Sequence, residues 1–139
     1  MARAQKELDS GIERIAVGGV SQGAAMAIYT AINSEVPLKS VFAISGWIPL
    51  HHKLAPLVDA VTPESFPPIM LAHSAKDPIV DIKYGRKTKE LLKKWGLKVK
   101  WREFPSEGHG VPDLYWPEVL AYLSETLKGD AGSRRGDEL

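Results

Sequence analysis

Short apolar segments alternate with helical patterns along this chain, and that alternation restricts the fold more than any other feature. The apolar segments predict strands at residues 14–18, 41–45, 69–73 and 99–104. Helical patterns occur between and after them, at residues 22–33, 54–60, 81–95 and 116–128. Strands separated by helices are joined by crossover connections and form a parallel sheet. The predicted class is therefore α/β, with about four parallel strands and flanking helices. In the last strand, apolar and charged side chains alternate, which indicates a position nearer the sheet edge.

The chain of 139 residues fits a single domain, and its 44% apolar content is sufficient for a buried core. We assign this domain to residues 1–128, beginning with a polar helix at residues 2–9. Residues 129–139 (GDAGSRRGDEL) have almost no apolar side chain and are predicted to be a disordered tail. The uncharged run at residues 15–34 has the length of a membrane span, but its glycines and polar residues argue against one.

Composition and charge exclude several classes of function. The formal net charge of +1 argues against nucleic acid as a partner. The chain has no cysteine, which excludes disulfides, thiolate metal sites and a cysteine nucleophile. The first residues are too polar for a secretory signal, so we expect a cytoplasmic location.

A Gly-x-Ser-x-Gly motif, from Gly19 to Gly23, lies between the first predicted strand and the helix that follows. This context is typical of a nucleophilic serine, here Ser21, held on a strained turn above a parallel sheet. We expect side chains at Gly19 and Gly23 to collide with the neighbouring strand and helix. The backbone N–H of Gln22 is expected to point at a developing oxyanion. The alternative interpretation is a glycine-rich turn in which Ser21 caps the helix.

Two further polar loops follow later strands. Asp77 comes after the third strand and either orients a histidine or starts a turn before Pro78. His109, with a glycine on each side, comes after the fourth strand and is either a catalytic base or an ordinary exposed loop residue. Together with Ser21 they follow the chain order Ser, Asp, His of an α/β-hydrolase triad. We therefore predict that these three residues form a catalytic triad.

Four segments also carry a family resemblance, namely residues 14–27 (RIAVGGVSQGAAMA), 44–50 (ISGWIPL), 72–80 (AHSAKDPIV) and 108–110 (GHG). They resemble the phospholipase/carboxylesterase family of α/β-hydrolases, which includes the acyl-protein thioesterases. The resemblance runs from about residue 7 to residue 127. It implies that Ser21 is the nucleophile, Asp77 the acid and His109 the base, with an oxyanion amide from Gln22. It also implies hydrolysis of carboxylic esters or thioesters without a metal or organic cofactor, and an S-acylated protein or a lysophospholipid as substrate.

The resemblance places Trp47, Ile48 and Leu50 near an acyl-binding channel; an ordinary core patch is the alternative. Family members begin with further strands, so the resemblance implies an N-terminally truncated hydrolase that lacks one oxyanion amide. Ser74 also departs from the family, which commonly has glycine at this position. We expect the truncated chain to be weakly active, or to act as a binding or regulatory module. We also expect self-association through the exposed strand at residues 14–18.

Two other features allow weaker interpretations. A metal site built from His51, His52, His73 and Asp77 is disfavoured, because adjacent histidines on a strand point apart. The helix at residues 81–95 carries six basic and two acidic side chains, namely Lys83, Arg86, Lys87, Lys89, Lys93 and Lys94 against Asp81 and Glu90. It is interpreted as a solvated basic face; the alternative is transient contact with an anionic membrane surface.

Overall fold

The computed structural model describes Ala2, Lys6, Asp9 and residues 14–128 of the chain. Within this part, four parallel strands form one sheet and follow the order of the sequence across it. They are β1 (Ala16–Val20), β2 (Ser40–Ile44), β3 (Ile69–Ser74) and β4 (Val99–Phe104). The predicted α/β class with four parallel strands is confirmed. The strand with alternating side chains, β4, lies at a sheet edge, as predicted.

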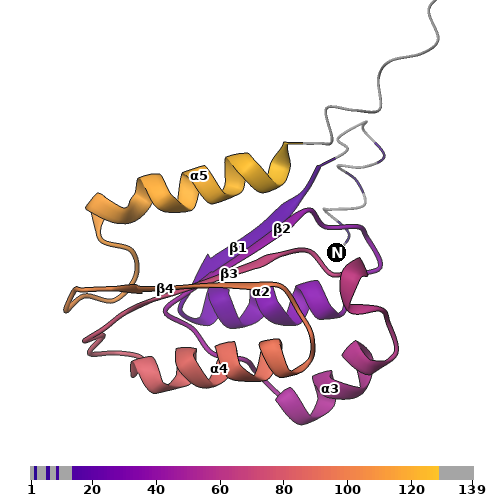
Figure 1. Ribbon diagram of the computed structural model, residues 1–139, viewed down its shortest axis with the longest axis horizontal. Coiled ribbons are helices and arrows are strands. Elements are labelled where there is room, and N and C mark those ends of the chain that lie inside the picture. Colours follow the sequence, from indigo (N-terminus) through magenta and orange to yellow (C-terminus); the bar gives the residue numbers. More distant parts are fainter. Residues whose placement is uncertain (1, 3–5, 7–8, 10–13, 129–139) are drawn as a thin grey trace, which may run out of the picture.

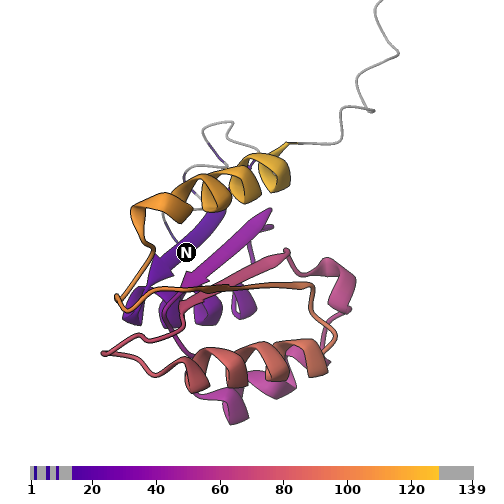
Figure 2. The same cartoon turned by 60° about the vertical axis from the view of Figure 1, so that its left-hand side comes forward.

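Helices cover both faces of the sheet. Of the four helices from residue 14 to residue 128, three lie on one face and one on the other (Figures 1 and 2). The first three are α2 (Gln22–Ile32), α3 (His51–Asp59) and α4 (Ile82–Lys94), and the single helix is α5 (Trp116–Leu127). Short 3-10 turns, η1 (Pro63–Ser65) and η2 (Asp113–Tyr115), precede β3 and α5. α3 begins earlier than predicted, because the carbonyl of Leu50 accepts hydrogen bonds from Lys53 (2.8 Å) and Leu54 (3.2 Å).

Several expectations concern the chain termini or a membrane span. The three described residues of the predicted helix at residues 2–9 are helical. The rest of that helix and the predicted tail at residues 129–139 lie outside the described residues. Within the described chain, no helix has the length and apolar character needed to cross a bilayer. The uncharged run at residues 15–34 instead forms β1, the turn after it and α2.

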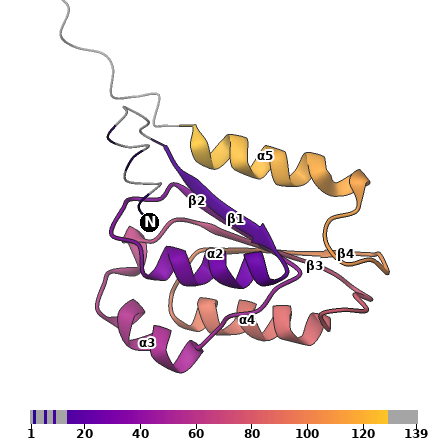
Figure 3. The ribbon, with the colours of Figure 1, turned by 180° about the vertical axis from the view of Figure 1, so that it is seen from behind.

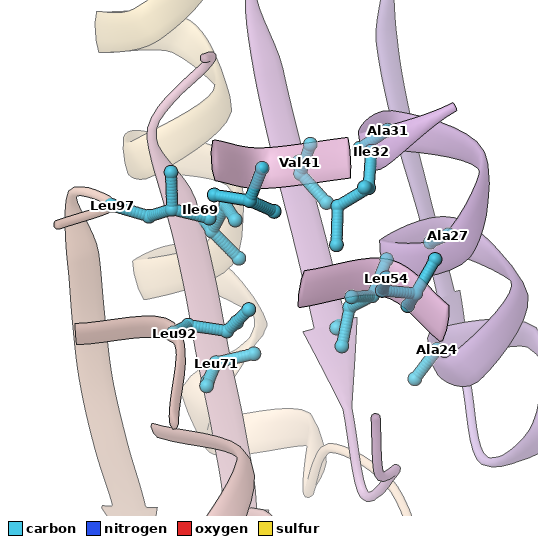
Figure 4. Close-up of a cluster of buried hydrophobic side chains, with 13 residues drawn as sticks. Ala24, Ala27, Ala31, Ile32, Val41, Leu54, Ile69, Leu71, Leu92 and Leu97 are labelled. Atoms are coloured by element: carbon cyan, nitrogen blue, oxygen red, sulfur yellow. The ribbon is translucent and has the colours of Figure 1, made fainter. Parts of the chain in front are cut away.

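The larger core cluster lies between the sheet and the three helices on its first face (Figure 4). Side chains of β3 alternate between the two faces: Ile69 and Leu71 belong to this cluster, whereas Met70 and Ala72 belong to the cluster under α5. All six residues of β3 are buried. A strand covered on both faces has to be a continuous apolar run, which is the pattern that predicted it.

Polar contacts as well as apolar burial hold α5 on the second face of the sheet. Tyr122 of α5 is buried, and its hydroxyl donates to the carbonyls of Pro68 (2.7 Å) and Val41 (3.1 Å). Arg102 of β4 makes two hydrogen bonds, of 2.7 and 3.0 Å, to the carboxylate of Glu118. α5 is therefore tied to both β2 and β4, and the loop before it has a fixed position relative to the sheet.

β1 has one strand neighbour among the described residues, so its outer edge is open (Figure 3). The carbonyl of Ile15 and the N–H of Ser21 both bond to the β2 side of the sheet, each at 2.8 Å. Backbone groups alternate in direction along a strand, so the intervening even-numbered residues face the open edge. These residues are Ala16, Gly18 and Val20. No residue of β1 is fully buried, and an unpaired apolar edge is a template for pairing with another strand.

We expect the chain to self-associate through this open edge of β1. Ala16→Lys should shift the chain toward monomer, because a charged side chain on an edge strand opposes pairing. Size-exclusion chromatography with light scattering measures the mass of each form over a concentration series. Ala121→Lys, on the exposed side of α5, is the matched control for the added charge. A wild-type chain that stays monomeric across the series would show that this edge does not associate.

Candidate active site

The loops that leave the carboxyl ends of the four strands gather at one end of the sheet, on the left in Figure 1. We call this end, where all four strands finish, the carboxyl edge. Parallel α/β sheets carry their functional groups at this edge. The residues predicted from the sequence as site residues lie in these loops or at the start of the next helix, and they are Ser21, Gln22, Trp47, Ile48, Leu50, Asp77 and His109.

Ser21 occupies the sharp turn between β1 and α2. Its backbone angles are φ 57° and ψ −121°, a combination that residues with a side chain rarely adopt. Its N–H donates to the carbonyl of Ile44 at 2.8 Å, which ties the turn to β2. The side chain of Ser21 makes no capping hydrogen bond to α2, so the interpretation of this serine as a helix cap is wrong. A serine that directly follows a strand, has a strained backbone and does not cap the next helix with its side chain has the geometry of a nucleophile elbow.

The two glycines of the motif differ in their surroundings. A Cβ at Gly19 would overlap the backbone carbonyl of Gly23, so the close approach of α2 to β1 requires glycine at position 19. A Cβ at Gly23 would have no heavy atom within 4 Å. The expected collision is therefore confirmed at Gly19 and wrong at Gly23, because Gly23 lies on the exposed side of the first turn of α2.

The Asp77 carboxylate is buried, with 0% of its side chain exposed, and both of its oxygens accept hydrogen bonds. Oδ1 accepts from the N–H groups of Ile79 (2.8 Å) and Val80 (2.9 Å), which closes a turn before α4. Oδ2 lies 2.7 Å from Nδ1 of His109. Asp77 thus forms a turn with one oxygen and contacts a histidine with the other, so the two interpretations of this residue are compatible.

The hydrogen bonds of Asp77 outweigh the effect of its burial on its acidity. Burial raises the pKa of Asp77. The N–H of Val80, the His109 ring and the N–H of Ile79 together lower this pKa below its ordinary value. An ionised carboxylate only accepts hydrogen bonds, so Nδ1 of His109 carries the proton in this contact. The other ring nitrogen, Nε2, is then the one that can take up a proton.

The loop of His109 lies beside the Ser21 turn. A Cβ at Gly110 would lie 3.7 Å from Cγ1 of Val20, so the residue after His109 is close to the residue before Ser21. The His109 side chain is 24% exposed. In the described structure the Ser21 hydroxyl has no hydrogen bond to the His109 ring. Such contacts are often long in free enzymes and tighten when substrate binds.

The buried ring of His73 supports the turn that carries Asp77. Nε2 of this ring lies 2.8 Å from the carbonyl of Val80. The same nitrogen lies 3.6 Å from Oδ2 of Asp77. The sequence signal for this role was a polar residue at the end of an otherwise apolar strand, but the partner was not evident from the sequence.

The strand geometry assumed for His51 and His52 is wrong. Both residues lie in the first turn of α3, with ring centroids 5.8 Å apart in a T-shaped arrangement. Across the described residues, no cluster of three or more His, Cys, Asp or Glu side chains is positioned to hold a metal ion.

The three residues expected near an acyl-binding channel differ in exposure. Ile48 packs against the larger core cluster, and its N–H donates to Oγ1 of Thr88 at 2.9 Å. Trp47 is half-buried, whereas Leu50 is 49% exposed in a left-handed conformation. Gln22 is the first residue of α2, where backbone N–H groups lack partners within the helix. Its N–H is therefore available to donate a hydrogen bond to a ligand oxygen.

A parallel sheet with a strained serine after one strand and an Asp–His pair at the same edge defines the α/β-hydrolase class of fold. The chain belongs to the family described as Phospholipase/Carboxylesterase, whose model matches residues 3–127.

Similar proteins and structures agree with this family. Acyl-protein thioesterase 1 of Neurospora crassa is 40% identical over 125 residues, which are 88% of this chain and 51% of that protein. Acyl-protein thioesterase 1 of Mycosarcoma maydis is 42% identical over 120 residues, with 83% of this chain and 49% of that protein covered. The crystal structure of Zea mays acyl-protein thioesterase 2 superimposes with a TM-score of 0.79 at 27% identity, covering 91% of this chain and 63% of that one. The chain thus spans about half the length of the curated relatives it matches.

The contrast between the two motif glycines predicts opposite effects of alanine. Gly19→Ala should lower the free energy of unfolding by about 1–3 kcal/mol, because the new methyl group must displace backbone. Gly23→Ala should raise it by up to about 1 kcal/mol, because alanine is the better helix former and the space is open. Urea denaturation followed by circular dichroism compares the two variants directly. Equal effects would contradict the difference in their surroundings.

The lowered pKa of Asp77 predicts a specific dependence of stability on pH. Below an ordinary carboxyl pKa of about 4, the unfolded chain binds a proton that folded Asp77 does not. Stability from Asp77 is therefore complete above that pH and is lost as pH falls through the lowered folded value. We expect Asp77→Asn to be less stable at neutral pH and to lack this acid-induced loss in urea denaturation. Asp113→Asn, at an exposed carboxylate, is the control; parallel pH profiles for wild type and Asp77→Asn would contradict the expectation.

Proposed function

We propose that this chain is a serine hydrolase that cleaves carboxylic esters or thioesters. Ser21 is the nucleophile, His109 the general base and Asp77 the acid that orients the histidine. The observation that most supports this proposal is the strained Ser21 turn beside the contact between the buried Asp77 carboxylate and the His109 ring.

The proposed reaction is acyl transfer in two steps. Nε2 of His109 takes the Ser21 hydroxyl proton as the serine oxygen attacks the carbonyl carbon, and the protonated ring then donates to the leaving alcohol or thiol. Water, activated by the same nitrogen, releases the acid from the acyl-serine in the second step. The ionised Asp77 carboxylate holds the Nδ1–H tautomer and stabilises the imidazolium that forms in each step. This chemistry needs no metal or organic cofactor.

Stabilisation of the oxyanion rests on the N–H of Gln22 at the amino end of α2. Helix amino ends favour negative charge, and this N–H lacks a partner within the helix. A second donor is not assigned within the described residues. Absence of one oxyanion donor typically costs about 10²- to 10³-fold in rate. We therefore expect slow turnover from this chain, and covalent labelling is the more sensitive test of the site.

We further propose that the substrate is an S-acylated protein or a lysophospholipid. The names of the relatives favour the thioester of an acylated protein. Trp47 and Leu50, at the same edge of the sheet as Ser21, offer partly exposed apolar surface for an acyl chain. Ile48 is also partly buried and packs against the larger core cluster, so it links this segment to the core.

Transient contact with an anionic membrane surface is proposed for the basic side of α4. The apolar side chains of Ile82 and Leu92 are buried, and the side of this helix that faces solvent is mostly basic, with Tyr84 49% exposed among the charges. Lys83 and Arg86 are engaged in ion pairs with Asp81 (3.7 Å) and Glu103 (2.8 Å). The contact we propose is therefore electrostatic and sensitive to salt.

A fluorophosphonate probe tests the proposed nucleophile on the folded chain. We expect the wild type to be labelled at Ser21, as located by mass spectrometry, and Ser21→Ala not to be labelled. Ester and thioester hydrolysis should fall by about 10⁴- to 10⁶-fold in Ser21→Ala, and adding His109→Ala should cost little more, because the residues act as a unit. Ser124→Ala, at an exposed serine of α5, is the matched control.

The outcomes separate two classes of function. More than about a tenth of the activity remaining in Ser21→Ala would identify another nucleophile. A folded wild-type chain that is not labelled would favour a binding or regulatory module without turnover.

A further inference from the structure

Two buried serine hydroxyls bond to the residue that follows His109. Ser45 comes directly after β2 and Ser74 ends β3, and both residues are 0% exposed. The Ser45 hydroxyl oxygen accepts from the N–H of Gly110 at 3.0 Å, and the Ser74 hydroxyl donates to the carbonyl of Gly110 at 3.2 Å. Side chains from two neighbouring strands thus hold both backbone polar groups of one glycine.

These bonds restrict the backbone on the carboxyl side of His109. The N–H of Gly110 belongs to the same peptide group as the carbonyl of His109. Holding this N–H therefore fixes the orientation of the peptide plane between His109 and Gly110. Gly110 has a φ of 104°, and glycine on its own moves readily among many conformations. The residues before His109, Glu107 and Gly108, are exposed and provide little packing. On the carboxyl side, the serine bonds act together with the packing of Val111 against the core cluster under α5.

The two serines are themselves held in place. Ser106 donates its hydroxyl proton to the Ser74 hydroxyl at 2.7 Å, so Ser74 both accepts and donates. Ser45 has a φ of 52°, and its N–H donates to the carbonyl of Ala72 at 2.8 Å. A residue with a side chain keeps such a strained backbone only where its surroundings impose it, and strain of this kind clusters at functional sites.

We infer that Ser45 and Ser74 are positioning residues that aim the His109 ring at Asp77. This inference deepens the proposed function and rests on it. The Ser45 hydroxyl holds the peptide group after His109, and the Ser74 hydroxyl holds the peptide group that follows it. Together they keep Nδ1 of His109 at 2.7 Å from the Asp77 carboxylate. A residue without a side-chain hydroxyl at position 74 could not make the Ser74 contact.

The tautomer of His109 is the readout that separates positioning from general stabilisation. We propose two-bond ¹H–¹⁵N correlation spectra of the histidine rings in the full chain, with the His109 signals assigned by their absence in His109→Gln. The wild type should give neutral His109 protonated at Nδ1. Ser74→Ala and Ser45→Gly should shift it toward the Nε2-protonated form that dominates in free histidine. Ser45→Gly removes the hydroxyl while relieving the positive φ, so it remains informative if Ser74→Ala does not fold.

Ser40→Ala is the matched control, because Ser40 is equally buried but lies at the opposite end of β2 from Ser45. It should leave the His109 tautomer unchanged. A wild-type tautomer in folded Ser45→Gly and Ser74→Ala would overturn the inference.

Probe labelling provides the second measurement. In the positioning variants the rate of Ser21 labelling should fall at least about tenfold, since small misplacements of a catalytic group have large costs. If the wild type is not labelled, the proposed function fails, whereas the tautomer measurement still decides whether the serines position His109.

Discussion

The buried carboxylate of Asp77 is the constraint on which the arrangement of this site depends. An ionised group without solvent is tolerated only when hydrogen bonds replace the lost water, and removing those bonds would leave a costly unpaired charge. Two of the bonds come from the turn that Asp77 itself begins, and the third comes from His109, thirty-two residues further along the chain. The His73 ring contacts the same turn at the carbonyl of Val80. The energetic requirement of one carboxylate therefore determines where two separate loops meet.

A regular series of backbone hydrogen bonds fixes the point at which each of these loops leaves its strand. Ser21 donates to Ile44, Ser45 donates to Ala72, and Ala75 donates to Phe104, each at 2.8 Å. At each step, the residue that follows one strand is bonded to the next strand in the sheet. The loops therefore leave the sheet from fixed points, and two of those points, Ser21 and Ser45, have strained backbone. The parallel sheet supplies the rigid support that such strain needs in order to persist.

The sequence predicted the fold well because burial on both faces of a strand leaves a simple apolar pattern, most clearly in β3. It also predicted the residues now found together at the carboxyl edge, because Gly19 and its neighbours form a recognisable local motif. The contacts that position these residues were not predictable in the same way. Ser45 and Gly110 are 65 residues apart, and Ser74 and Gly110 are 36 apart. A serine at the end of a strand has many possible partners, and only the packed structure selects one. The error at Gly23 has a similar origin, because the motif does not specify which side of the helix is open.

The open edge of β1 links the stability of the Ser21 turn to whatever pairs with that strand. The turn is now tied to the sheet from one side, through the bond to Ile44 and the close packing of Gly19 on α2. A strand added at Ala16, Gly18 and Val20 would restrain the same backbone from the other side. A partner that binds the ordered form of this strand, and not its disordered form, stabilises the strained turn by mass action. Since the turn carries the proposed nucleophile, association at β1 and the ordered conformation of the Ser21 turn are thermodynamically coupled, and each favours the other.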